Sequence, residues 1–207
     1  FARIKEFSLL FQGVTESTFP HQLGYEFIEC GRQIERADKT CRILDAKRYM
    51  KTLHAIEADS LDDAQWAALL KGCSAFEAYH RIFAANIEAH NVRKFLLLSR
   101  HFPRSVLFCI QKLQNALHSI SQCPISHFSN EPERLTGRLI SILKYSTDKD
   151  LEGDGATKII AEIEDELAVI AVELSKSYMF SDIIDPALEI EAGADDESIV
   201  PQAQSTS

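Results

Sequence analysis

Apolar residues recur every three or four positions along most of the first 180 residues of this chain. This spacing places one apolar stripe along each helix. It predicts helical segments at about residues 2–12, 19–55, 60–85, 92–98, 103–122, 130–143 and 156–180. Glycine (8) and proline (6) are scarce, which favours helices further, and no segment shows the alternation of a strand. The pattern predicts an all-α fold, an antiparallel bundle of six to seven helices.

The C-terminal segment has a different composition. Residues 181–207 contain seven acidic residues and no lysine or arginine, and Pro186, Gly193 and Pro201 interrupt their few apolar positions. We therefore predict a helical domain at 1–180 and a disordered acidic tail at 181–207. The formal net charge of −9 lies mostly in this tail, so the helical body has no basic excess for binding nucleic acid.

The composition also suggests a location in the cell. The sequence has no apolar run of 18 residues, so we expect no membrane span. Its five cysteines are scattered and include no CxxC pair, which favours small buried side chains in a reducing, cytoplasmic compartment over disulfides or zinc. The chain opens without a methionine, and we expect it to start inside a longer polypeptide.

The segment from Gly24 to Tyr49 carries an unusual polar pattern. Its apolar stripe is centred on Ile34, yet two aspartates project into that stripe and two further charged residues line its edge, with an arginine nearby. This polar seam consists of Glu35, Arg36, Asp38, Arg42 and Asp45. Buried carboxylates need partners, because an unpaired one is very costly. The seam predicts an ion-pair network that fixes how helices meet; the alternative is a charged groove for a ligand, a partner or a metal ion.

Arg104 is a further candidate binding residue. Pro103 is expected to open a helix, which would place Arg104 in its first turn. A positive side chain in the first turn is repelled by the positive end of the helix dipole. We therefore expect a carboxylate of the seam to pair with Arg104 and offset this repulsion.

Familiar catalytic and cofactor motifs are missing from the sequence. It contains no GxxxxGK[ST], GxGxxG, GxSxG or HExxH. One ExxH spans Glu77 to His80, but a di-iron bundle needs a second. We therefore predict no cofactor, no metal site and no catalytic residue.

Three motifs resemble those of the bacterial alpha-E family, named for a helical domain with an ER motif. They are Gly31-Arg32-x-Ile34-Glu35-Arg36-Ala37 with Leu44-Asp45, Phe95-Leu96-Leu97-Leu98 before Phe102-Pro103-Arg104-Ser105-Val106, and Gly137-Arg138-Leu139 with Tyr145. They span about residues 7–180, and the chain looks like the C-terminal two-thirds of a typical member. Ser99 and His101 depart from the Asp and Arg common in the family.

The resemblance implies an all-helical protein associated with ATP-grasp ligases and transglutaminase-like proteases. From it we expect a non-catalytic helical partner or scaffold in a bacterial system that makes or modifies peptides. The alternative function is an enzyme that uses the carboxylates of the ER-motif helix as acid, base or metal ligands. A homo-oligomer that completes the seam across a two-fold axis is a further alternative.

Overall fold

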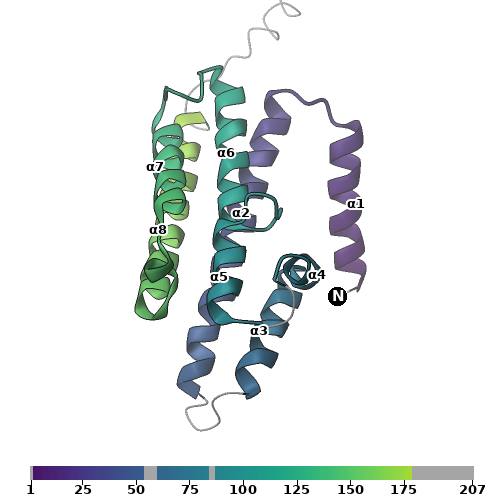
Figure 1. The fold of residues 1–207 in the computed structure, drawn as a ribbon. Helices are drawn as coiled ribbons and strands as arrows, with labels where there is room; N and C mark the ends of the chain where they lie inside the picture. The colour runs from purple at the N-terminus through teal and green to yellow at the C-terminus, as the bar shows by residue number, and fades with distance from the viewer. Residues whose placement is uncertain (1, 54–59, 84–86, 179–207) are drawn as a thin grey trace, which may run out of the picture.

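The structure is a computed structural model that describes residues 2–53, 60–83 and 87–178, and all regular secondary structure in these residues is helical (Figure 1). The predicted all-α fold is confirmed, and the described part of the chain forms seven substantial α-helices and one short one. The elements are α1 (Ala2–Thr18), α2 (Leu23–Leu53), α3 (Ser60–Gly72), α4 (Phe76–His80), α5 (Ala89–Leu98), α6 (Val106–Ser121), α7 (Glu131–Tyr145), the 3₁₀ helix η1 (Asp148–Leu151) and α8 (Gly153–Tyr178).

Four long helices form the centre of the bundle. The pairs α2–α6, α6–α7, α7–α8 and α2–α8 pack against one another, and neighbours run in opposite directions (Figure 1). Their facing stripes bury a continuous apolar core, in which the fully buried side chains include Cys41, Ile110, Leu117, Leu139 and Ile163. The 3.6-residue apolar pattern of the sequence therefore becomes one closed core.

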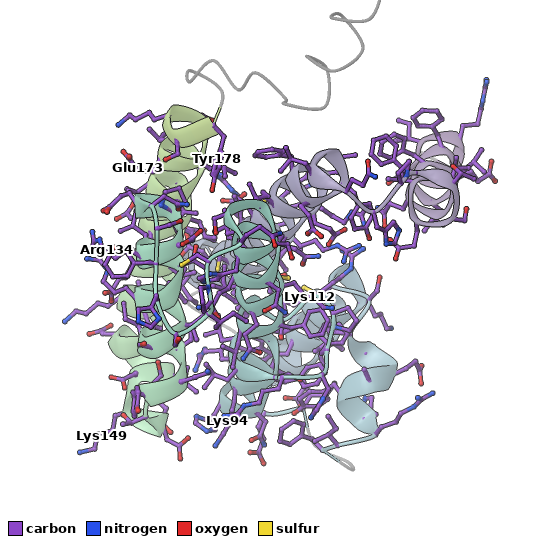
Figure 2. The ribbon with its side chains drawn as sticks, turned by 90° about the horizontal axis from the view of Figure 1, so that it is seen from above. Lys94, Lys112, Arg134, Lys149, Glu173 and Tyr178 are labelled. Atoms are coloured by element: carbon purple, nitrogen blue, oxygen red, sulfur yellow. The ribbon has the colours of Figure 1, made fainter. Side chains whose placement is uncertain are left out.

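α1 lies beside this core and not within it, as both views show (Figures 1 and 2). Polar contacts join it to α2: the hydroxyl of Tyr25 donates to Glu16 at 2.7 Å, and Arg36 donates to Gln12 at 3.2 Å. Its large apolar side chains face solvent. Ile4, Phe7, Leu10, Phe11 and Val14 are 48–71% exposed.

Some helix boundaries differ from the predicted ones. A break was expected from Gly13, but α1 continues to Thr18, because a glycine inside a helix costs only about 1 kcal/mol. The hydroxyls of Ser17 and Thr18 donate to the carbonyls of Gly13 and Val14 one turn earlier. The segment predicted at 60–85 is divided at Gly72, a residue that weakens a helix: α3 ends there, and α4 begins at Phe76.

The start of α6 also differs. The side chain of Ser105 accepts a hydrogen bond from the Phe108 amide at 3.3 Å, so Ser105 is the N-cap. Pro103 and Arg104 therefore precede the helix, and the prediction that Arg104 occupies its first turn is wrong. The short apolar run before this turn forms the buried face of α5, as predicted.

Two glycines have roles other than those expected. Gly155 lies inside α8 where a turn was predicted, and a Cβ at this position would stand 2.5 Å from the Lys149 carbonyl oxygen. A glycine is needed at this position because the backbone of η1 lies too close to that of α8 to leave room for a side chain. A glycine inside the helix predicted at 130–143 leads one to expect close backbone packing at Gly137, but the nearest atom to its Cβ position is Gln114 Nε2 at 3.8 Å. That expectation is wrong.

No helix in the described ranges is both long and apolar enough to cross a bilayer. Residues 181–207 lie outside those ranges, so the predicted acidic tail and its boundary remain predictions.

Candidate functional site

Thr40 joins two of the sequence motifs. Its hydroxyl, on α2, lies 3.0 Å from the Arg36 carbonyl oxygen and 2.8 Å from the Arg104 carbonyl oxygen. Thr40 is buried where α2 meets the turn before α6. The ER motif and the segment at 102–106 therefore meet in space, although 64 residues separate Thr40 from Arg104.

The expected ion pair of Arg104 is not formed. Arg104 is exposed, and it makes no ion pair with any residue that the structure describes. Because it lies before the N-cap of α6 and reaches solvent, water can hydrate its charge and no carboxylate is required. Arg36 is half-buried, and its guanidinium donates to Gln12 on α1.

The polar seam does not enter the interior as one network. Glu35 is exposed and pairs with Lys39 at 2.5 Å, one turn along the same helix. Asp38 is half-buried and pairs with Arg42 at 2.7 Å, also one turn away. Pairs of this kind on a helix surface stabilise it by only about 0.3–0.5 kcal/mol each. The predicted ion-pair network between helices is therefore not formed by these two pairs, because both lie within α2, and Asp38 and Asp45 are half-buried.

Asp38 and Asp45 lie close to a third carboxylate that the sequence did not single out. Glu164 of α8 is half-buried, and its pKa is raised above the usual range, first by burial and then by the negative charge of Asp45. Asp38 adds to this effect, while Arg42 opposes it. Like charges that face one another across α2 and α8 thus disfavour the ionised form of Glu164.

Replacing Glu164 with glutamine is expected to stabilise the chain near pH 7. A raised pKa means that the folded state holds the proton more tightly than the unfolded state, so the stabilising contribution of Glu164 is present below its unfolded pKa and lost as pH rises through the folded pKa. We expect Glu164→Gln to raise the free energy of unfolding by up to about 1 kcal/mol at pH 7 and by nothing near pH 4.

Thermal unfolding from pH 4 to 8 measures this effect. Glu162→Gln, a change of the same type at an exposed position on α8, is the matched control and should be neutral throughout. A Glu164→Gln gain that does not change with pH would contradict the assigned cause.

A surface pocket of 290 Å³ lies between α7, η1 and α8. Its lining includes Tyr145, Asp150, Lys158 and Glu162. None of the six candidate residues from the sequence lines it. The seam and this pocket are therefore separate features.

Four of the five cysteines are buried side chains without reactive character, as the sequence predicted. Burial raises the pKa of the Cys30 and Cys109 thiols to about 12 and that of Cys73 to about 11, and it raises the pKa of Cys41 well above the usual range. The exception is Cys123, which is half-buried.

Cys123 belongs to a polar corner between α6 and α7 that the sequence analysis missed. His118 and Glu133 are buried there, with their Nδ1 and Oε2 atoms 3.9 Å apart. Burial would raise the pKa of Glu133, but hydrogen bonds from Ser121 and Ser129 outweigh it and hold the pKa below its usual value. A loop without regular structure separates these residues, so their spacing matches no familiar motif and nothing in the sequence marks them as neighbours.

A comparison with known protein families shows to which family the chain belongs. The alpha-E family, described as a predicted alpha-helical domain with a conserved ER motif, matches residues 1–179. The chain belongs to the alpha-E family. The match covers every helix described above.

Similar proteins are known from mycobacteria. Uncharacterised proteins of Mycobacterium tuberculosis and Mycobacterium bovis are each 26% identical to the chain over 166 residues. The matched region is 80% of this chain but only 18% of each relative, so the chain corresponds to a small part of a much longer polypeptide in these species. No solved structure matches the chain.

Proposed function

We propose that this alpha-E chain is a non-catalytic binding partner, and that it docks onto another protein through the exposed face of α1. The proposed partner is an ATP-grasp ligase of a peptide-synthesis or peptide-modification system, the class that the family resemblance implies. A transglutaminase-like protein is the other partner implied by that resemblance.

The apolar face of α1 is the observation that carries this proposal. Ile4, Phe7, Leu10, Phe11 and Val14 fall within an arc of about 120° around the helix. All five are more than 45% exposed, and a large exposed apolar patch usually marks an interaction site. A helix with such a stripe fits an apolar groove on a partner, which would bury the stripe.

The polar side of α1 is already occupied. Gln12 and Glu16 contact α2, and Thr15 is buried, so these contacts hold the helix on the bundle while its apolar face points elsewhere. The bundle can therefore present α1 without burying its stripe. In the mycobacterial relatives the matched region is joined to a far longer chain, which supports a role beside other protein domains.

The seam gives less support to an enzyme. A catalytic site requires carboxylates that converge on a concave pocket and remain free to react. Here Glu35 and Asp38 are paired with neighbours on their own helix, and the 290 Å³ pocket includes neither.

Binding to the purified ATP-grasp ligase tests the proposal. We expect isothermal titration calorimetry to detect a complex with the unmodified chain. Phe7→Glu should weaken it by about 30-fold or more, as expected for an aromatic anchor at the centre of an interface. Leu9→Glu is the matched control: Leu9 is 61% exposed on the same helix but faces away from the stripe, so its change should leave affinity within about twofold.

Other outcomes would overturn parts of the proposal. If both variants lose affinity equally, the apolar stripe is not the surface of α1 that contacts the ligase. If sedimentation shows a dimer of the chain that Phe7→Glu dissociates, the occupant of the face is a second copy and not the ligase. If the chain forms no complex with the ligase, the ligase is not its binding partner.

A further inference from the structure

Three potential metal ligands meet at the corner between α6 and α7. His118 lies in the last turn of α6, Cys123 in the connection that follows, and Glu133 in the first turn of α7. One donor atom from each side chain lies within 4.8 Å of the other two. This corner is independent of the α1 face and of the function proposed for it.

Glu133 has an unusual electrostatic environment. Its side chain is 0% exposed, and among the described residues no lysine or arginine forms an ion pair with it. The basic side chain beside it is His118, which is 5% exposed and is charged only when its imidazole is protonated. Hydrogen bonds satisfy the Glu133 oxygens, but no described side chain with a permanent positive charge balances the buried carboxylate. A cation at this corner would supply that charge.

Neighbouring groups hold the Glu133 carboxylate in place. The backbone amide of Ser129 donates to Oε2 at 2.7 Å, and the side-chain amide of Asn130 donates to Oε1 at 2.9 Å. Asn130 is held in turn by the Tyr178 hydroxyl at 2.8 Å, at the end of α8 (Tyr178 is labelled in Figure 2). Outer hydrogen bonds of this kind orient the ligands of a metal site.

We propose that His118, Cys123 and Glu133 bind a zinc ion. Imidazole nitrogen, thiolate sulfur and carboxylate oxygen are the three donor types that Zn²⁺ takes in proteins, at about 2.0–2.3 Å. Tetrahedral coordination at these lengths places the donors about 3.5 Å apart, and the His118 and Glu133 atoms are already 3.9 Å apart. Side-chain shifts of about 1 Å or less would close the site.

The corner also allows the ion to enter. Cys123 is half-buried next to the exposed residues 124–129, so it forms the open side of the corner. Binding converts its thiol to a thiolate and releases that proton to solvent. His118 Nδ1 lies 2.9 Å from the Cys123 carbonyl oxygen, which can only accept, so Nδ1 carries a proton in the metal-free chain. Zinc binding replaces this hydrogen bond, and the imidazole proton moves to Nε2. Three protein ligands leave a fourth position for water, and the ion would tie the end of α6 to the start of α7.

Metal binding to the full chain tests this inference. The chain is stripped of metal with a chelator and then titrated with Zn²⁺ against a chromophoric competitor. We expect one equivalent to bind, and Co²⁺ in its place should give a sulfur-to-cobalt charge-transfer band together with the intense visible bands of tetrahedral cobalt. Cys123→Ser should abolish the charge-transfer band and weaken Zn²⁺ binding at least about tenfold.

The controls separate a site from chance binding. Cys73→Ser changes another cysteine and should leave both readouts unchanged, whereas His118→Gln should weaken binding as Cys123→Ser does. Glu133 also caps α7, so the decision rests on the Cys123 and His118 variants, each checked for helix content by circular dichroism. If no stoichiometric ion binds, or if both variants keep affinity within twofold, the result is an adventitious metal only and the inference fails.

Discussion

Replacing Tyr79 with alanine is expected to lower the free energy of unfolding by about 3–5 kcal/mol, the usual cost of removing a buried aromatic ring. Tyr79 is fully buried, its ring stacks on Phe83 with centroids 4.9 Å apart, and it meets Phe95 edge to face at 5.8 Å. It also makes a hydrogen bond to the backbone of Glu88, the N-cap residue of α5. Tyr79 is thus the fully buried side chain of the five-residue α4, beside the partly buried Phe76 and Ala78 that also pack on the core.

Chemical denaturation of three variants measures this effect. Tyr79→Phe keeps the ring and loses only the hydroxyl, so it should cost about 1 kcal/mol. Tyr145→Ala removes a tyrosine that is 85% exposed and should change stability by less than about 0.5 kcal/mol. A loss below about 1 kcal/mol for Tyr79→Ala would mean that α4 contributes little to the fold.

Gly155→Ala is expected to destabilise the chain by about 2–3 kcal/mol, although alanine favours helices. The added Cβ would stand 2.5 Å from the Lys149 carbonyl oxygen and 3.3 Å from the Asp150 Cα. Both are backbone atoms of η1, which cannot turn aside as a side chain can. The clash should displace η1 from the first turn of α8.

Gly31→Ala is the matched control for this substitution. Gly31 also lies inside a helix, but no atom comes within 4 Å of its Cβ position. Alanine there should raise stability by about 1 kcal/mol through helix propensity alone. The melting temperature should therefore fall for Gly155→Ala and rise for Gly31→Ala. A change in the same direction for both variants would contradict the packing described at Gly155.

The fold could be predicted from the sequence because local and long-range signals agree. Leu113, Leu117 and Ile120 follow one helical stripe, and the structure places that stripe against neighbouring helices. Boundaries were less predictable. Pro103 suggested a helix start, but Ser105 offers a side-chain oxygen to the free amide of Phe108, and that hydrogen bond moved the start by three residues.

The candidate site was harder to predict, since an angular position on one helix does not say what lies opposite. Asp38 and Asp45 were expected within the apolar stripe and are half-buried, but the facing carboxylate is Glu164, more than 100 residues later in the chain. Glu35 bonds along its own helix to Lys39. His118 and Glu133 are brought together by the path of the loop between α6 and α7. The spacing of apolar residues within helices carries no information about that path.

The position of α1 has a consequence for how this domain can diverge. Its outward apolar residues contribute little to the core, so substitutions among them are nearly free of folding constraints, whereas residues such as Leu117 are not. If α1 docks as proposed, recognition and folding are encoded by separate positions. Members of the family can then change the partners they recognise by altering this one helix, while the same bundle is inherited intact.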